Sequence, residues 1–112
     1  MAVPTGRAWI GASWVPIVQE VELSHFGEYR SFPKPQIAIG PVRGEIAALT
    51  AIHETFEAIS DIYDLNLKET QIRCIEHAVA GLIVRSPELV DWAISELRKA
   101  ENPCPMSTPF VD

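Results

Sequence analysis

The sequence predicts an α+β fold in which a small antiparallel sheet of two or three strands precedes three helices. Apolar residues lie two apart in the first part of the chain, and from residue 44 onward they recur at steps of three and four. The length of 112 residues and the 47% hydrophobic content suit one domain with a buried core. We therefore expect a single domain over residues 1–101 and a flexible, proline-rich tail over 102–112.

The strands are expected in the first 39 residues. Residues 14–23 alternate in the way of a half-buried strand, and Pro16 favours an edge or a bulge because it has no amide proton. Residues 8–10 can form the other arm of a hairpin, since glycine follows them. The segment 24–35 contains glycine and two prolines and predicts a loop. Residues 36–39 predict a further short strand.

Three helices are expected after the strands, packed on the sheet. The first, over about residues 44–63, has an apolar stripe at alternating steps of three and four. Its members are Leu49, Ile52, Phe56, Ile59 and Tyr63. The same steps predict a second helix over about 69–84. A hydroxyl cap, a proline and an acid at 86–88 begin a third helix, which should end near Ala100 and pack Trp92 on the sheet.

Charge and composition limit the function classes. The 15 acidic and 9 basic residues give a net charge of −6, and no segment concentrates lysine or arginine, so direct nucleic-acid binding is not expected. The chain has no apolar run that would span a bilayer and no secretory signal pattern at its start, which predicts a cytoplasmic protein. Cys74 and Cys104 are predicted to be free thiols.

The sequence His53-Glu54-Thr55-Phe56-Glu57 lies in the middle of the first predicted helix. Residues four apart share a helix face, so His53 and Glu57 can bind one small cation. Glu54 points beside them and can hold the water that a metal polarises, as in zinc peptidases with a His-Glu-x-x-His helix. A solvated polar face is the alternative interpretation of so short a motif. The pair lies off the apolar stripe and next to alanines, which favours a cleft.

The stretch QIAIGPVRGEIAALTAIHETFEAISDIYDLNLKETQI resembles small phage and prophage proteins of the zinc-metallopeptidase type. In these proteins a strand leads into a His-Glu-x-x-Glu-Ala or His-Glu-x-x-His-Ala helix, followed by a Leu-x-Leu turn and a second helix. Ala58 follows the motif here, residues 63–67 match the turn, and residues 85–92 match the start of the last helix. The resemblance implies a minimal zincin-like fold.

The resemblance also implies a ligand set. The third metal ligand is expected just after the Leu-x-Leu turn, as a histidine when the helix motif ends in glutamate. Glu69 occupies that position, so the chain departs from the pattern and offers His53, Glu57 and Glu69, one nitrogen and two oxygen donors. Such a set binds a divalent cation, with zinc implied by the family and manganese or iron also compatible.

Two other residues are alternative third ligands. Glu76 follows Glu69 by seven residues and lies nearly on the same helical face, although a salt bridge at the rim would also explain it. His77 would restore a two-histidine site, but it lies nearly opposite the apolar stripe and is more typical of an exposed surface histidine. His25, in the predicted loop, could reach the cleft as a donor that stabilises an oxyanion, but an ordinary loop histidine is the favoured interpretation.

The predicted function is a metal-dependent hydrolase of metallopeptidase type, of phage or prophage origin, acting in the bacterial cytosol. Glu54 is the expected catalytic base, and a peptide substrate is expected to pair along the strand 36–39. The rival prediction is an inactive metallopeptidase-like scaffold without a cofactor, which binds and inhibits a host protein. A net charge of −6 would suit docking on a basic host surface.

Overall fold

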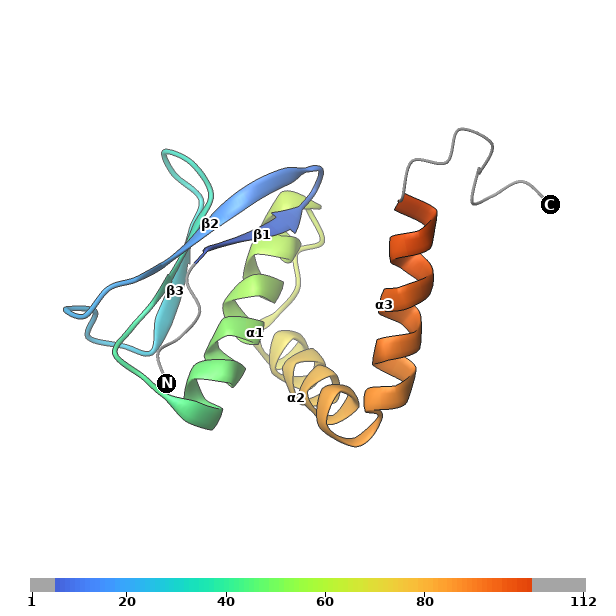
Figure 1. Ribbon diagram of the computed structural model, residues 1–112. Helices are drawn as coiled ribbons and strands as arrows, with labels where there is room; N and C mark the ends of the chain where they lie inside the picture. Colours follow the sequence, from blue (N-terminus) through green and yellow to red (C-terminus); the bar gives the residue numbers. More distant parts are fainter. Residues whose placement is uncertain (1–5, 102–112) are drawn as a thin grey trace. The chain divides into compact units, whose positions relative to one another are not determined.

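The structure, a computed structural model, describes residues 6–101, so the predicted tail 102–112 lies outside the described residues. The chain divides into two compact units, Met1–Ala80 and Gly81–Asp112. Four strands and three helices follow one another within residues 6–101 (Figure 1). They are β1 (Gly6–Ile10), β2 (Ser13–Gln19), β3 (Gly27–Arg30), β4 (Gln36–Ile39), α1 (Gly44–Ile62), α2 (Glu69–Arg85) and α3 (Pro87–Glu101).

The α+β class is confirmed, but the sheet is mixed and four-stranded, with the order β1-β2-β4-β3. The predicted hairpin is present, since β1 and β2 are antiparallel with Trp9 opposite Trp14. β2 and β4 are parallel, with Ile17 opposite Ile37. β3 lies antiparallel to β4 at the edge. The prediction of an antiparallel sheet of two or three strands is therefore wrong.

The strand that the sequence pattern does not reveal is β3. It lies inside the segment 24–35, for which the sequence predicts a loop, and its four residues are too few to show a period of two among the nearby prolines. Its presence changes the role of β4, which is paired on both sides, with β2 and with β3. The expectation that a substrate pairs along Gln36–Ile39 is wrong because this strand has no free edge.

Pro16 lies on an inner strand, whereas the sequence predicts an edge or a bulge at this position. It precedes the stretch of β2 that pairs with β4, which begins at Ile17. The proline therefore lies where β2 has β1 as its strand neighbour, a position that suits a residue without an amide proton. β2 ends at Gln19, and Val21, which the sequence pattern includes in the strand, is 74% exposed.

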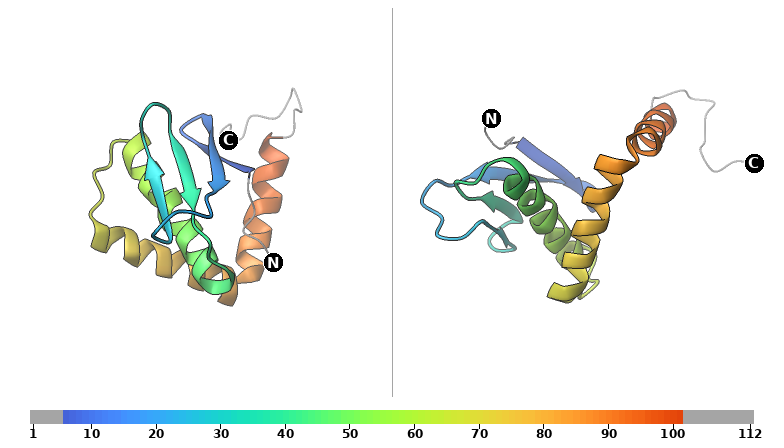
Figure 2. Two further views of the ribbon diagram at one scale, coloured as in Figure 1. Left: turned by 90° about the vertical axis from the view of Figure 1, so that its left-hand side faces the viewer. Right: turned by 90° about the horizontal axis from the view of Figure 1, so that it is seen from below.

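The core of the first unit lies between the sheet and α1, which runs along one face of the sheet (Figures 1 and 2). Its buried apolar members come from β1, β2, β4 and α1. They are Ile10, Val15, Ile37, Ile39, Ala47 and Ala58. The buried positions of α1 are small or polar, whereas Leu49, Ile52 and Phe56 of the predicted stripe are only half-buried. The helix therefore turns its alanines, and not its widest apolar stripe, toward the sheet.

Glycine at position 27 permits β3 to lie close to α1. A Cβ atom there would lie 2.7 Å from Thr50 Cγ2, 3.0 Å from the Ala38 carbonyl oxygen and 3.3 Å from Glu54 Cγ. Tyr29 adds a polar tie, because its hydroxyl donates a 2.7 Å hydrogen bond to Asp61 on α1. Burial, together with this bond to a carboxylate, raises the pKa of Tyr29 to about 12.

A group of charged side chains joins the end of β2 to β3. Arg30 donates to both oxygens of Glu20, at 2.6 and 2.7 Å, and also to Glu28. His25 lies 2.8 Å from Glu28. The hydrogen bonds from Arg30 hold the pKa of both carboxyls below their usual range, although some desolvation opposes this.

The second unit contains the end of α2 and the whole of α3. Trp92, Leu89 and Leu97 of α3 are each more than half exposed. The packing of Trp92 on the sheet stays a prediction. Cys74, in the first unit, is an exposed free thiol as predicted, and Cys104 lies outside the described residues. No helix within residues 6–101 has the length and apolar character needed to cross a membrane.

Gly27→Ala should lower the free energy of unfolding by about 1–3 kcal/mol, because the added methyl group meets a side chain and a carbonyl that cannot both move freely. Gly81→Ala is the matched control, since a Cβ at Gly81 meets nothing within 4 Å and alanine favours a helix over glycine. Urea denaturation of both variants measures the difference. Equal stability of the two would contradict the close approach of β3 to α1.

Arg30→Met should lower the melting temperature at neutral pH but have little effect in acid. The lowered pKa values of Glu20 and Glu28 mean that Arg30 stabilises the fold above the usual carboxyl range. This contribution disappears as the pH falls and the two carboxyls become protonated. Melting curves from pH 3 to 7 test the effect. Lys34→Met is the matched control, since it removes one positive charge from an exposed position. A pH-independent loss would contradict the assignment.

Candidate metal centre

α1 presents His53 and Glu57 on successive turns of one face. The Nε2 atom of His53 lies 3.6 Å from Glu57 Oε2, and the two side chains are 16% and 37% exposed. His53 lines a cleft of about 510 Å³ and does not belong to the apolar core. The pair thus occupies an accessible face of α1, where the helical spacing of four residues places it.

The turn between α1 and α2 returns the chain toward this face. Ser60, buried in the last turns of α1, accepts a 2.8 Å hydrogen bond from the Leu67 amide through its hydroxyl. Asp64 and Asn66 both adopt a φ of 55°, in the left-handed region that these two residue types tolerate better than most. These local features end α1, reverse the chain and place Glu69 as the first residue of α2.

Glu69 completes a group of three potential ligands. Its Oε1 atom lies 2.9 Å from His53 Nε2, and one ligand atom each from His53, Glu57 and Glu69 lies within 4.8 Å of the other two. Ligands about 2.1 Å from a tetrahedral metal are about 3.4 Å apart, which the 3.6 Å distance from Nε2 to Glu57 matches. The 2.9 Å distance from Nε2 to Glu69 is that of a charge-assisted hydrogen bond, which a bound ion would replace. These three side chains could hold a divalent metal ion.

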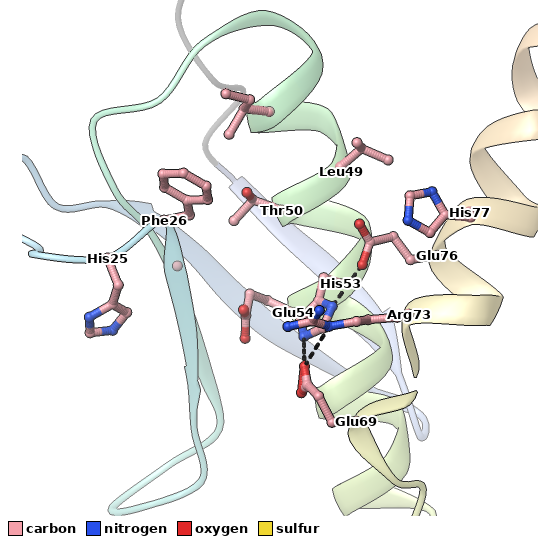
Figure 3. A pocket seen from close by; sticks show the side chains of 12 residues that line it. His25, Phe26, Leu49, Thr50, His53, Glu54, Glu69, Arg73, Glu76 and His77 are labelled. Carbon is pink, nitrogen blue, oxygen red and sulfur yellow. Dashed lines mark hydrogen bonds and ion pairs between the residues drawn. The ribbon is translucent and has the colours of Figure 1, made fainter. Parts of the chain in front are cut away.

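Glu76 contacts the opposite side of the His53 ring. Its Oε1 atom lies 2.7 Å from His53 Nδ1, and its side chain is 12% exposed (Figure 3). The sequence allows Glu76 as an alternative third ligand, but it is not a member of the three-residue group. The structure therefore places Glu69 and Glu76 on different nitrogens of one imidazole.

The two other histidines line the same cleft without joining the group. His77 is exposed, and no hydrogen bond or ion pair links it to His53 in the part of the chain that the structure describes. His25 has Glu28 as its partner at 2.8 Å. Figure 3 shows both imidazoles apart from the His53 ring. Glu69, and not His77, is thus brought to the His53/Glu57 pair.

Glu54 lies on the sheet-facing side of α1 and lines the cleft. It is 8% exposed, and within residues 6–101 no hydrogen bond or ion pair joins its carboxyl group to another side chain. Burial is the main cause that raises the pKa of Glu54 to about 7; His53 opposes this shift, and the charges of Glu57 and Glu69 add to it. A carboxyl group in this state can both accept and release a proton near neutral pH.

The charges around His53 are unbalanced. Burial disfavours the imidazolium form, but the hydrogen bond to Glu76 and the charges of Glu54 and Glu69 outweigh it and raise the pKa of His53. Arg73, whose Nε atom is 3.8 Å from Glu69, is the nearby cation of α2. Several carboxylates around one imidazole form a donor set that a divalent cation would neutralise.

Three features of the site are not indicated by the sequence pattern. Ser60 and Gly27 are small residues whose importance depends on contacts with Leu67 and Thr50, and no pattern of spacing indicates such contacts. The apolar side of the cleft is the third. It is lined by Phe26, which directly precedes β3, and by Ile46 and Leu49 of α1. The sequence does contain a local signal for the turn between α1 and α2. Asp64 and Asn66 lie on either side of Leu65, and aspartate and asparagine tolerate the left-handed backbone conformation.

Comparison of the chain with models of known protein families, with curated proteins and with solved structures returned no match. The resemblance to phage proteins of the zinc-metallopeptidase type therefore rests on the quoted residues alone and stays a prediction.

His53→Ala should abolish stoichiometric binding of a divalent ion, because it removes the one nitrogen ligand and the side chain that Glu57 and Glu69 both face. Metal content after dialysis, measured by atomic emission on the folded protein, tests this. His77→Ala is the matched control, since it removes an imidazole of the same cleft that has no contact with the group. Equal metal loss in both variants would show that the three-residue group is misassigned.

Proposed function

We propose that the protein is a metal-dependent hydrolase of peptide bonds, with zinc as its expected ion and manganese or iron as alternatives. One observation supports this most directly. His53 Nε2 faces Glu57 and Glu69, at 3.6 and 2.9 Å, and Glu54 lies in the same cleft as a buried carboxyl group without a partner among the described side chains. A ligand set beside an unpaired acid/base is the arrangement that metal-assisted hydrolysis requires.

The proposed roles follow from position. His53, Glu57 and Glu69 would hold the ion, which when bound supplies Lewis acidity toward a carbonyl group and toward water. Glu54 would accept a proton from the attacking water and return it to the leaving nitrogen as the carbon–nitrogen bond breaks. Its burial favours this role because the neutral and charged forms then differ little in free energy near pH 7.

The proposed substrate is an extended peptide that pairs with β3. This strand ends the sheet order and has β4 as its strand neighbour, so its other edge offers backbone donors and acceptors within the described chain. Gly27, at the start of β3, lines the cleft together with His53 and Glu54. A peptide paired with β3 would therefore lie beside the proposed metal ligands, because Gly27 and His53 line the same cleft.

A second candidate function is favoured by the donor set itself. One histidine with two carboxylates is less typical of zinc enzymes than a set with two histidines. The alternative is an inactive scaffold of the same shape that needs no cofactor and inhibits a basic host protein, which the net charge of −6 would help it to approach. Both proposals place a phage or prophage protein in the bacterial cytosol, with a peptide or a host protein as partner and neither nucleic acid nor membrane.

Glu54→Gln should leave folding and metal content nearly unchanged but lower peptide hydrolysis by about 10²–10⁴-fold, because a base acts only when a proton moves. The measurement combines metal stoichiometry with turnover of a fluorogenic peptide library by the zinc-loaded and manganese-loaded protein. Glu45→Gln is the matched control, an exposed glutamate in the first turn of the same helix.

Two results would decide against the enzyme. Wild-type protein that binds a divalent ion but hydrolyses no peptide with zinc, manganese or iron would favour the inactive scaffold. Hydrolysis that persists in Glu54→Gln would show that another group, or a contaminating peptidase, moves the proton. In the first case, unchanged binding of a host protein by Glu54→Gln and His53→Ala would support the scaffold function.

A further inference from the structure

The contact between His53 and Glu76 is the best-buried polar contact of the site, and the proposed mechanism assigns Glu76 no role. Their side chains are 16% and 12% exposed, and 23 residues separate them in the chain. Burial of a carboxylate is costly unless it accepts hydrogen bonds. Glu76 has such a bond from one specific atom, Nδ1 of His53.

The chemistry of imidazole makes the choice of nitrogen important. A neutral ring has one protonated nitrogen and one free lone pair, and a metal ion binds the lone pair. An ionised carboxylate can only accept, so without an ion the contacts of Glu69 and Glu76 each favour a protonated ring nitrogen. An ion shared by His53, Glu57 and Glu69 would replace the proton on Nε2, the atom that faces Glu69 at 2.9 Å and Glu57 at 3.6 Å, and Glu76 would keep the proton on Nδ1.

We propose that Glu76 is a positioning residue of the metal centre, which holds the Nδ1 proton of His53 and so directs Nε2 toward Glu57 and Glu69. This inference rests on the proposed metal site. One helix thereby supplies both an ion ligand and the residue that orients another ligand, because Glu69 and Glu76 lie seven residues, about two turns, apart on α2. The partner of a metal-binding histidine typically contributes about 10–100-fold to metal affinity.

Figure 3 shows Glu76 and Glu69 on different sides of the His53 ring. Two alternative roles of Glu76 predict other results. If Glu76 were itself a ligand, the ion would bind Nδ1 of His53, the atom that Glu76 contacts. If Glu76 had a purely structural role, its loss would change the stability of the fold but not the affinity of the folded protein for the ion.

The test compares Glu76→Leu and Glu76→Gln in the full chain. Leucine removes the acceptor, whereas the glutamine carbonyl oxygen can still accept the Nδ1 proton without its charge. Zinc affinity of the folded fraction is measured by chelator competition, and circular dichroism checks the fold of each variant. We expect Glu76→Leu to lose about 10–100-fold in affinity and Glu76→Gln to lose clearly less. His77→Ala, the neighbouring position on α2, should lose nothing.

A spectroscopic measurement keeps the proposal falsifiable if Glu76→Leu does not fold. In the zinc-loaded wild-type protein with ¹⁵N-labelled histidine, NMR should show His53 bound through Nε2 and protonated at Nδ1. Zinc on Nδ1 would overturn the positioning role and make Glu76 a candidate ligand. Equal zinc affinity of wild type and a folded Glu76→Leu would also overturn it, in favour of a structural role.

The outcomes also separate this inference from the proposed function. Zinc bound through Nε2 without any peptide hydrolysis would leave the role of Glu76 standing while the enzyme proposal failed. Hydrolysis that survives unchanged in a folded Glu76→Leu would do the reverse. A wild-type protein that binds no divalent ion would overturn both.

Discussion

The close packing of α1 on the sheet determines most of what the first unit can do. Ala47 and Ala58 are buried against the sheet, and Gly27 admits β3 to within van der Waals distance of Thr50. A helix face of small residues leaves space for one larger polar side chain, and Glu54 occupies it. Burial beside this close contact raises the pKa of Glu54, because partial loss of solvent disfavours its charged form.

The same helix organises the site through its second face. His53 and Glu57 lie four residues apart on α1, and the turn held by Ser60 brings Glu69 to the His53 ring. Glu76 then meets the ring from its other side. The side chains around the imidazole therefore depend on two helices and the one turn that joins them, which explains how a short polypeptide can build a potential metal centre.

β3 connects the fold with the cleft. Tyr29 ties this strand to Asp61 on α1, and the charged group around Arg30 joins it to Glu20 at the end of β2. These contacts make a four-residue strand stable at the edge, although its sequence alone has little strand character. Because β3 takes the edge, β4 is enclosed, and any peptide that adds to this side of the sheet must meet β3 beside Gly27.

The α+β class, the hairpin and the three helices could be predicted from the amino-acid sequence, because they depend on periodicity and on local signals such as the proline at 87. The sequence also indicated His53, Glu57 and Glu69 as neighbours, through helical spacing for the first two and through the family resemblance for the third. The mixed sheet, the face of α1 that packs on it and the nitrogen that Glu76 contacts became known from the three-dimensional structure. These depend on pairing and packing between distant segments, which no local pattern specifies.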